Sequence, residues 1–251
     1  MKYPRIPVLV GAALLGLSAC SGENSTPPFT GAVRVGNGII DSNGLDMSIS
    51  NIATFSGIEI GTASGITDAP IGSYKAQLTS NSVTFTVDGV SVDHDNVTTV
   101  FAYGATGNGT EGGFPVEESL SAPTNGQAVV QPVHAALLAS SSASSLNFYW
   151  VKPGVCSTAV VGAAANGSAT FKASPASFAL AGGTYEICVT DAGGTVLFDS
   201  GPTGIALPTA NANVFQIAAY DAPSGTGNGS TLMLSLLDNN GGNTALYNLR
   251  N

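Results

Sequence analysis

The sequence is short of charge, and above all of positive charge. Charged residues make up 9% of its 251 positions, against about 25% in an average domain. Its 7 Lys and Arg residues are outnumbered by 16 Asp and Glu residues, and the formal net charge is −9. So few cations cannot neutralise a phosphate backbone by releasing counterions, which excludes nucleic acid as an expected partner.

Residue types that bind metals or perform catalysis are also scarce. The chain has 2 histidines and 3 cysteines, it contains no His-Glu-x-x-His run, and neither histidine lies near a Gly-x-Ser-x-Gly motif. Glycine is abundant instead, at 32 residues, and hydrophobic residues reach 43%. This composition predicts a packed, secreted β-protein with a neutral polar surface, and no cofactor or metal is expected.

The N-terminus has the pattern of a secretion signal. Lys2 and Arg5 precede an apolar block at residues 6–17, which is well short of the roughly 20 residues that a membrane-spanning helix needs. The block leads into LSAC, which resembles the lipobox of bacterial lipoproteins, where the signal is cut before a cysteine that is then acylated. We therefore predict a lipoprotein signal peptide at residues 1–19 and lipid attachment at Cys20.

The segment after the expected cleavage site indicates where the protein is held. Residues 20–30 are polar and include a Pro pair, which predicts a lipidated tether. Ser21, rather than an aspartate, follows Cys20, and this resembles the sorting pattern for the outer membrane. We expect the lipid anchor to hold the protein on the outer membrane, at the periplasmic face or the cell surface.

The remainder of the chain repeats itself. GSYKAQLT (72–79) returns as GTYEICVT (183–190), and matches to LDMSIS and VFAYGATGNGT lie in the same order, which indicates a tandem duplication. Short alternating runs between turn residues predict strands, in the first copy at residues 32–39, 45–50, 74–79, 83–90 and 98–104. The expected fold class is all-β, with two tandem Ig-like antiparallel β-sandwich domains at residues 31–126 and 127–251.

These strands also carry a family resemblance. AVRVGNG, the Asp46 of LDMSIS, the Gly-x-Tyr of GSYKAQLT and TTVFAYG resemble the domain of unknown function 4397, often found in tandem in bacterial envelope proteins. The resemblance covers most of Gly31 to Asn240, and it implies an extracellular Ig-like β-sandwich without a known activity. Asn147 replaces Asp46 in the second copy, which argues against a polar site that both copies share.

The aromatic residues of the strands are expected to be structural for the most part. Alternation turns Tyr74 and Tyr185 toward the core, where each hydroxyl would cap a loop as in a tyrosine corner. In the FYW run, Phe148 and Trp150 share the core-facing register, and only Tyr149 is expected to face solvent. One exposed tyrosine is a weak case for a sugar-stacking platform.

Two places in the sequence could still carry chemistry. One short stretch offers possible calcium ligands, without the order of an EF-hand loop, at Asp88, Asp93, His94 and Asp95. His134 could form a triad with a serine that the fold brings near it. The leading hypothesis is a non-enzymatic scaffold or binding module for an envelope or extracellular protein or glycan. The alternatives are an envelope hydrolase that uses His134 or the acids near His94, and a calcium-stiffened adhesin.

Two further predictions concern the second copy. Cys156 and Cys188 remain once Cys20 is acylated, and an oxidising compartment favours a disulfide between them. This bridge would fasten the loop after Trp150 to the outer side of the sheet. The end of the chain, Thr244 to Leu249, is alternating and apolar, so we expect it to pair with the second domain and close an exposed sheet edge.

Overall fold

The structure is a computed structural model in which nearly every element is a β-strand. It describes residues 30–249, except for 120–122, 124–125, 157–159, 161, 174–175, 208–212 and 225–230. The predicted signal peptide and Cys20 therefore lie outside the described residues. Within the described ranges, no helix has the length and apolar character that crossing a bilayer requires.

The first sandwich has two sheets, with strand orders β4-β1-β7-β8 and β3-β2-β5-β6. Its elements are β1 (Thr30–Ile39), β2 (Leu45–Ile49), β3 (Ala53–Ile58), β4 (Thr67–Pro70), β5 (Gly72–Ser80), β6 (Val83–Val92), β7 (Asn96–Gly104), the 3-10 helix η1 (Thr106–Asn108) and β8 (Gly112–Ser119). Each strand expected in the first copy is present, because alternating apolar residues cover the inner face of both sheets.

The second sandwich repeats this plan with one added strand in each sheet. Its sheets are ordered β12-β9-β16-β17-β18 and β11-β10-β13-β14, with β15 also paired to β13. Its elements are β9 (Gln127–His134), α1 (Leu137–Ser140), β10 (Ser145–Val151), β11 (Gly167–Thr170), β12 (Phe178–Ala181), β13 (Gly183–Asp191), β14 (Val196–Asp199), β15 (Ile205–Leu207), β16 (Val214–Asp221), β17 (Leu232–Asp238) and β18 (Asn243–Leu246). The all-β, tandem sandwich prediction is confirmed.

Pairing is mostly antiparallel, but each sandwich also contains one parallel pair. β1 runs parallel to β7, and β9 runs parallel to β16. The chain leaves β1 for the opposite sheet and returns to β7 in the same direction, so these strands cannot be joined by a hairpin. The matching registers of the two pairs give a residue-by-residue correspondence between the copies.

The repeated Gly-x-Tyr phrase has the predicted structural role. Tyr74 packs against the first core and its hydroxyl donates to the Pro70 carbonyl oxygen at 2.9 Å. Tyr185 packs against the second core and donates to the Ala181 carbonyl oxygen at 2.8 Å. A Cβ on Gly72 would lie 2.8 Å from the Tyr74 hydroxyl oxygen, so the glycine allows the ring to fold back over the turn.

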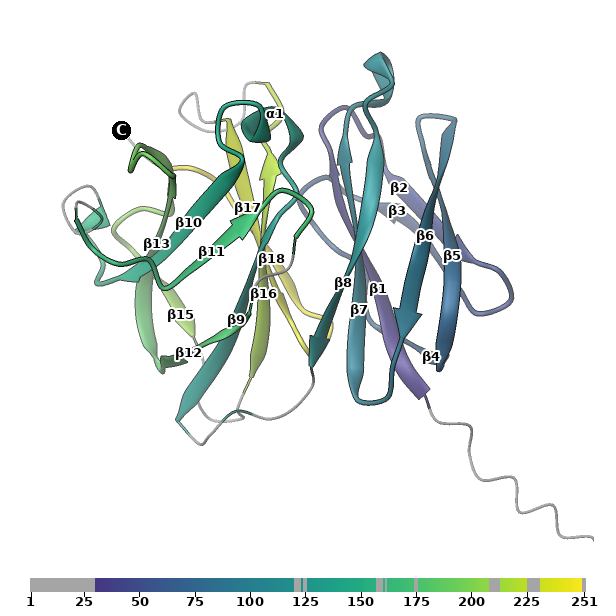
Figure 1. Cartoon of the computed structure of the whole chain (residues 1–251), viewed down its shortest axis with the longest axis horizontal. Coiled ribbons are helices and arrows are strands. Elements are labelled where there is room, and N and C mark those ends of the chain that lie inside the picture. Colours follow the sequence, from purple (N-terminus) through teal and green to yellow (C-terminus); the bar gives the residue numbers. More distant parts are fainter. Residues whose placement is uncertain are drawn as a thin grey trace, which may run out of the picture.

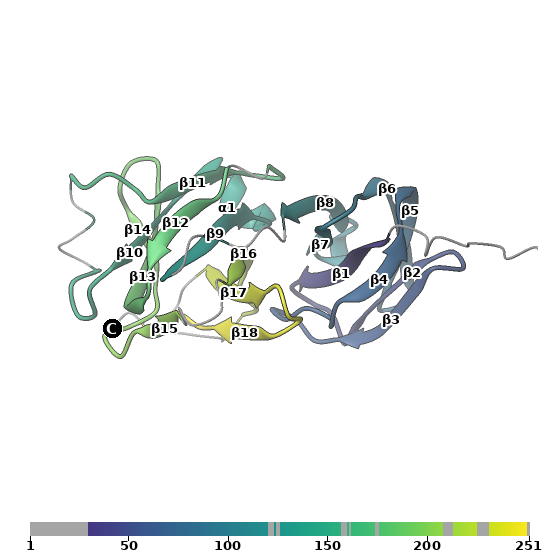
Figure 2. The same ribbon diagram turned by 90° about the horizontal axis from the view of Figure 1, so that it is seen from below.

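The two sandwiches lie side by side along the long axis of the molecule (Figures 1 and 2). The β4-β1-β7-β8 sheet of the first sandwich faces the β12-β9-β16-β17-β18 sheet of the second. A third buried cluster joins both, and its aromatic members are Phe101, Tyr103, Phe114 and Tyr220. Buried apolar surface of this kind holds the copies in one relative orientation.

The end of the chain closes the second sandwich as predicted. β18 pairs antiparallel with β17. Beyond it, the Leu249 amide donates to the Asp199 carbonyl oxygen at 2.9 Å, and the Asp199 amide donates to the Asn248 side-chain oxygen at 3.2 Å. The C-terminal segment thus contacts β17 in one sheet and the end of β14 in the other, which covers an edge of the sandwich.

Candidate functional site

The interface between the sandwiches depends on glycines in the AVRVGNG strand. A Cβ on Gly36 or on Gly38 would overlap the side chain of Tyr220, which comes from β16 of the other sandwich. The Tyr220 ring lies 6.2 Å from the Phe101 ring, centroid to centroid. The glycines of this strand are therefore required for close packing between the sandwiches.

A buried polar cluster is set into this apolar interface. Arg34 of β1 is 1% exposed, and its Nη2 donates to Glu118 Oε2 and to Gln216 Oε1, both at 2.9 Å. Its Nε donates to Thr99 Oγ1 at 2.8 Å, and its Nη1 donates to the Asp238 carbonyl oxygen at 2.6 Å. The guanidinium thus bonds to both sandwiches, because Thr99 and Glu118 belong to the first and Gln216 and Asp238 belong to the second.

Burial dominates the electrostatics of this cluster. Desolvation lowers the pKa of Arg34, although the nearby Glu118 carboxylate opposes the change. Desolvation raises the pKa of Glu118 to about 7, although Arg34 opposes that change. Glu118 Oε1 and the Tyr220 hydroxyl are buried and have no hydrogen-bond partner among the described residues. The interface therefore contains a carboxyl group that can exchange a proton near neutral pH.

The cluster sits at equivalent positions of the two copies. Arg34 is opposite Thr99 in the β1–β7 pair, and Gln131 is opposite Gln216 in the β9–β16 pair. Thr99 Oγ1 donates to Gln216 Oε1 at 2.7 Å, and Gln216 Nε2 donates to Gln131 Oε1 at 2.9 Å. The corresponding strands of the duplicated domain thus meet through these side chains.

This cluster was not predicted from the sequence. Its one usable signal was Arg34, a charged residue inside an apolar strand of a chain in which cations are rare. Glu118 and Gln216 carry no comparable signal, because only the packing of the two sandwiches brings them to Arg34.

His134 has a structural environment that the first copy reproduces with asparagine. The Ala136 amide donates to His134 Nδ1 at 3.3 Å, so Nε2 carries the proton and donates to the Ala143 carbonyl oxygen at 3.1 Å. Asn37 occupies the same register in β1, and its Oδ1 accepts from the Ile39 amide at 3.0 Å. Burial lowers the pKa of His134. Both ring nitrogens thus contact the backbone, and no serine hydroxyl bonds to them in the described hydrogen bonds.

The acids near His94 are not gathered around one point. Asp88 forms an exposed ion pair with Lys75 at 2.9 Å. Asp95 lies 2.8 Å from His94 Nδ1, and Asp93 accepts a hydrogen bond from Ser91 at 3.1 Å. Separate partners of this kind favour a solvated turn over a calcium site.

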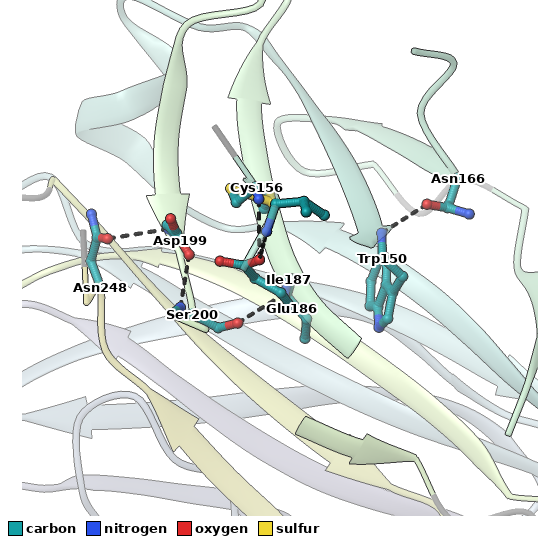
Figure 3. The surroundings of a disulfide bond; sticks show 11 residues. Trp150, Cys156, Asn166, Glu186, Ile187, Asp199, Ser200 and Asn248 are labelled. Carbon is teal, nitrogen blue, oxygen red and sulfur yellow. Dashed lines mark hydrogen bonds between the residues drawn. A yellow bond between two sulfur atoms is a disulfide. The ribbon is translucent and has the colours of Figure 1, made fainter. Parts of the chain in front are cut away.

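The predicted disulfide between Cys156 and Cys188 is present, with their Cα atoms 5.8 Å apart (Figure 3). It lies on the outer side of the sheet, in a small cluster separate from the core that contains Phe148 and Trp150. The expectation that Tyr149 faces solvent is wrong. Tyr149 is buried, because it lies opposite Cys188 on β13 and the bridged loop covers it.

Two carboxylates, Glu186 and Asp199, lie close to the disulfide, and Glu186 holds the bridged loop. Glu186 Oε2 accepts hydrogen bonds from the amides of Val155 and Cys156, at 2.8 and 3.1 Å. Asp199 Oδ1 accepts from the Gly201 amide at 2.7 Å. Ligand atoms of Cys156, Glu186 and Asp199 lie within 4.8 Å of one another. These side chains already have structural partners, and the sulfur belongs to the disulfide, which is a poor donor set for zinc.

The fold and the interface together define a tandem β-sandwich protein in which two duplicated domains are locked face to face. Residues 31–149 match the family described as Domain of unknown function (DUF4397), so the resemblance to that family is confirmed over this range. The match covers the first sandwich, β9 and most of β10, and the resemblance expected farther along the chain stays a prediction. No curated protein matches the chain.

Proposed function

We propose that this is a non-enzymatic lipoprotein of the outer membrane that presents a rigid pair of Ig-like sandwiches as a scaffold or binding module for protein or glycan. The interface carries the proposal. Sandwiches joined only by a linker move independently, whereas here Arg34 and Tyr220 are buried between the two sheets. A rigid tandem suits a protein that holds a surface at a set distance from its anchor.

The position of the chain start supports the same arrangement. β1 begins the first sandwich, which lies at the opposite end of the molecule from β10 and β13 (Figure 1). An anchor at Cys20 would hold the first sandwich next to the membrane and project the second away from it. The second sandwich also carries the disulfide, which suits the more exposed position.

The anchor is tested by replacing Cys20 with serine in the full chain. We expect wild-type protein to incorporate labelled palmitate and to sediment with outer membranes. The Cys20→Ser protein should remain an uncleaved precursor without label. A matched control, Ser21→Ala, should behave as wild type. If Cys20→Ser protein is still labelled and processed, the anchored-lipoprotein proposal is wrong.

The His134→Asn variant tests the alternative that the protein is a hydrolase. Asn37 makes the equivalent backbone contact in the first copy, so a structural histidine should accept this change with a small loss of thermal stability. His134→Leu should cost more, because the Ala136 amide then loses its acceptor. Any ester or peptide hydrolysis by wild-type protein that His134→Asn abolishes, while the melting temperature is kept, would favour the hydrolase.

A further inference from the structure

A hydroxyl and a carboxamide from different sandwiches meet inside the buried interface cluster. Thr99 of β7 and Gln216 of β16 are both fully buried, and Thr99 Oγ1 lies 2.7 Å from Gln216 Oε1. The contact places an alcohol beside a carbonyl group in a site that the surrounding apolar cluster keeps from solvent. Fixed proximity of this kind replaces a bimolecular encounter with an intramolecular one.

Arg34 is placed to activate this pair. Its Nη2 donates to Gln216 Oε1 at 2.9 Å, where negative charge would develop if the carbonyl carbon were attacked. Its Nε donates to Thr99 Oγ1 at 2.8 Å, which orients the hydroxyl oxygen and favours its deprotonated form. A guanidinium in a low-dielectric site stabilises such charges more strongly than it does in water.

Glu118 supplies a group that can carry the proton. In the β7–β8 pair Thr99 is opposite Val116, so Glu118 lies two residues along on the same face of the strand pair. Glu118 Oε2 shares Arg34 Nη2 with Gln216, and Oε1 has no hydrogen-bond partner among the described residues. Its pKa of about 7 permits both gain and loss of a proton at neutral pH.

We propose that Thr99 and Gln216 join spontaneously in an ester bond that covalently locks the two sandwiches together. Thr99 Oγ1 attacks Gln216 Cδ, and Arg34 stabilises the oxyanion on Oε1. The Thr99 hydroxyl turns from Gln216 Oε1, and Glu118 Oε1, which has no hydrogen-bond partner among the described residues, turns toward it and takes the proton. The Cδ–Nε2 bond then breaks, Glu118 returns the proton to Nε2, and ammonia leaves. One O–C bond replaces one C–N bond, and no oxidant or cofactor takes part. The reaction is independent of the proposed function, since it concerns the interface whatever the protein binds.

Peptide mapping of the full-length protein tests the bond directly. Protein purified from membranes is reduced, denatured and digested with trypsin, and cleavage after Lys172 separates Thr99 from Gln216 unless the ester joins them. We expect one linked species whose mass is about 17 Da below the sum of the two peptides, the mass of the ammonia lost. Hydroxylamine should split it into unmodified Thr99 peptide and a hydroxamate at position 216.

Variants assign the roles within the cluster. Thr99→Ser keeps a hydroxyl and should keep the link, whereas Thr99→Val matches the shape of threonine and should abolish it. Glu118→Gln should slow linkage by on the order of 100-fold and remove its dependence on pH near neutrality, a change that a structural role alone would not produce. The charged and titratable groups around Glu118 are Arg34, Asp238 and Tyr220.

The wild-type map decides the proposal without any variant. Two unlinked peptides, with the Gln216 amide intact in folded protein held at neutral pH, would overturn it and leave the cluster as a hydrogen-bond network. A linked species that persists in Thr99→Val protein would also overturn it, because the nucleophile would then lie elsewhere. Neither result bears on the lipid anchor, which the Cys20→Ser experiment tests separately.

Discussion

Replacing Arg34 with methionine should destabilise the protein strongly, and by more at alkaline than at acidic pH. Methionine fills a similar volume but leaves Glu118 buried without its counter-charge. Breaking one side of a buried ion pair costs about 3–5 kcal/mol. Below neutral pH Glu118 binds a proton and becomes neutral, so only the lost hydrogen bonds of Arg34 should remain, at about 1 kcal/mol each.

The assay is urea unfolding followed by circular dichroism, at pH 8 and at pH 5.5. The control is Lys75→Met, because Lys75 forms an exposed ion pair with Asp88, with side chains 75% and 70% exposed. Exposed pairs contribute about 0–1 kcal/mol, so this variant should unfold close to wild type at both pH values. The matched pair isolates burial as the cause.

A double variant completes the comparison. Arg34→Met combined with Glu118→Leu removes both charges, so it should recover much of the stability that the single change loses at pH 8. An Arg34→Met protein that loses no more stability than Lys75→Met at pH 8 would contradict this prediction. An equal loss at both pH values would also contradict it, since Glu118 would then not be the group left uncompensated.

Three further predictions concern the disulfide, the C-terminal strand and the proton held by Glu118. Replacing Cys156 and Cys188 by serine should destabilise the second sandwich by about 3–4 kcal/mol, because the bridge closes a sequence separation of 32 residues; calorimetry with and without reductant measures this, and an unchanged melting temperature would contradict it. Ending the chain at Gly242 removes β18 and should lower the melting temperature and promote aggregation through the exposed β17 edge, and a truncated protein that melts as wild type and stays monomeric in light scattering would show the strand to be dispensable. The pKa of Glu118 is about 7 in the folded protein against an ordinary 4.5, so the folded state holds this proton more tightly. The proton therefore contributes at most about 3 kcal/mol to the free energy of unfolding, which is complete below pH 4.5 and is lost as pH rises through 7. Glu118→Gln should flatten the resulting pH dependence in a series of unfolding curves, and an equal slope in both proteins would contradict the assignment.

Several features could be predicted from the sequence because local chemistry decides them. The spacing of Tyr74 and Tyr185 after their glycines requires the same folded-back ring in both copies, and the structure shows equivalent hydrogen bonds. The disulfide was predictable because Cys156 and Cys188 are the two cysteines that remain once Cys20 is acylated. β18 was predictable because its apolar residues alternate with polar ones and an Asn-Gly turn precedes it, and this pattern indicates a strand whichever strand it pairs with.

Other features were missed because they depend on what packs against each strand. Tyr149 alternates outward from the core, and it is buried because the disulfide loop covers the outer face. From the sequence, His134 was a candidate for a triad with a serine, and only the register shows that it occupies the position of Asn37. Neither the loop path nor the exact register can be read from a single copy of the pattern.

The sequence alone therefore determines the class of the fold and its duplication, since the period of apolar residues and the turn residues act within each copy. Only the tertiary structure decides how the copies meet. Arg34, Glu118 and Gln216 come from strands far apart in the chain, and the desolvation that raises the pKa of Glu118 exists only when the two sheets close over it. Apart from the charge of Arg34 in an apolar strand, chemistry that arises from burial between the domains has no local sequence signal here, because the residues are ordinary until the other domain excludes water from them.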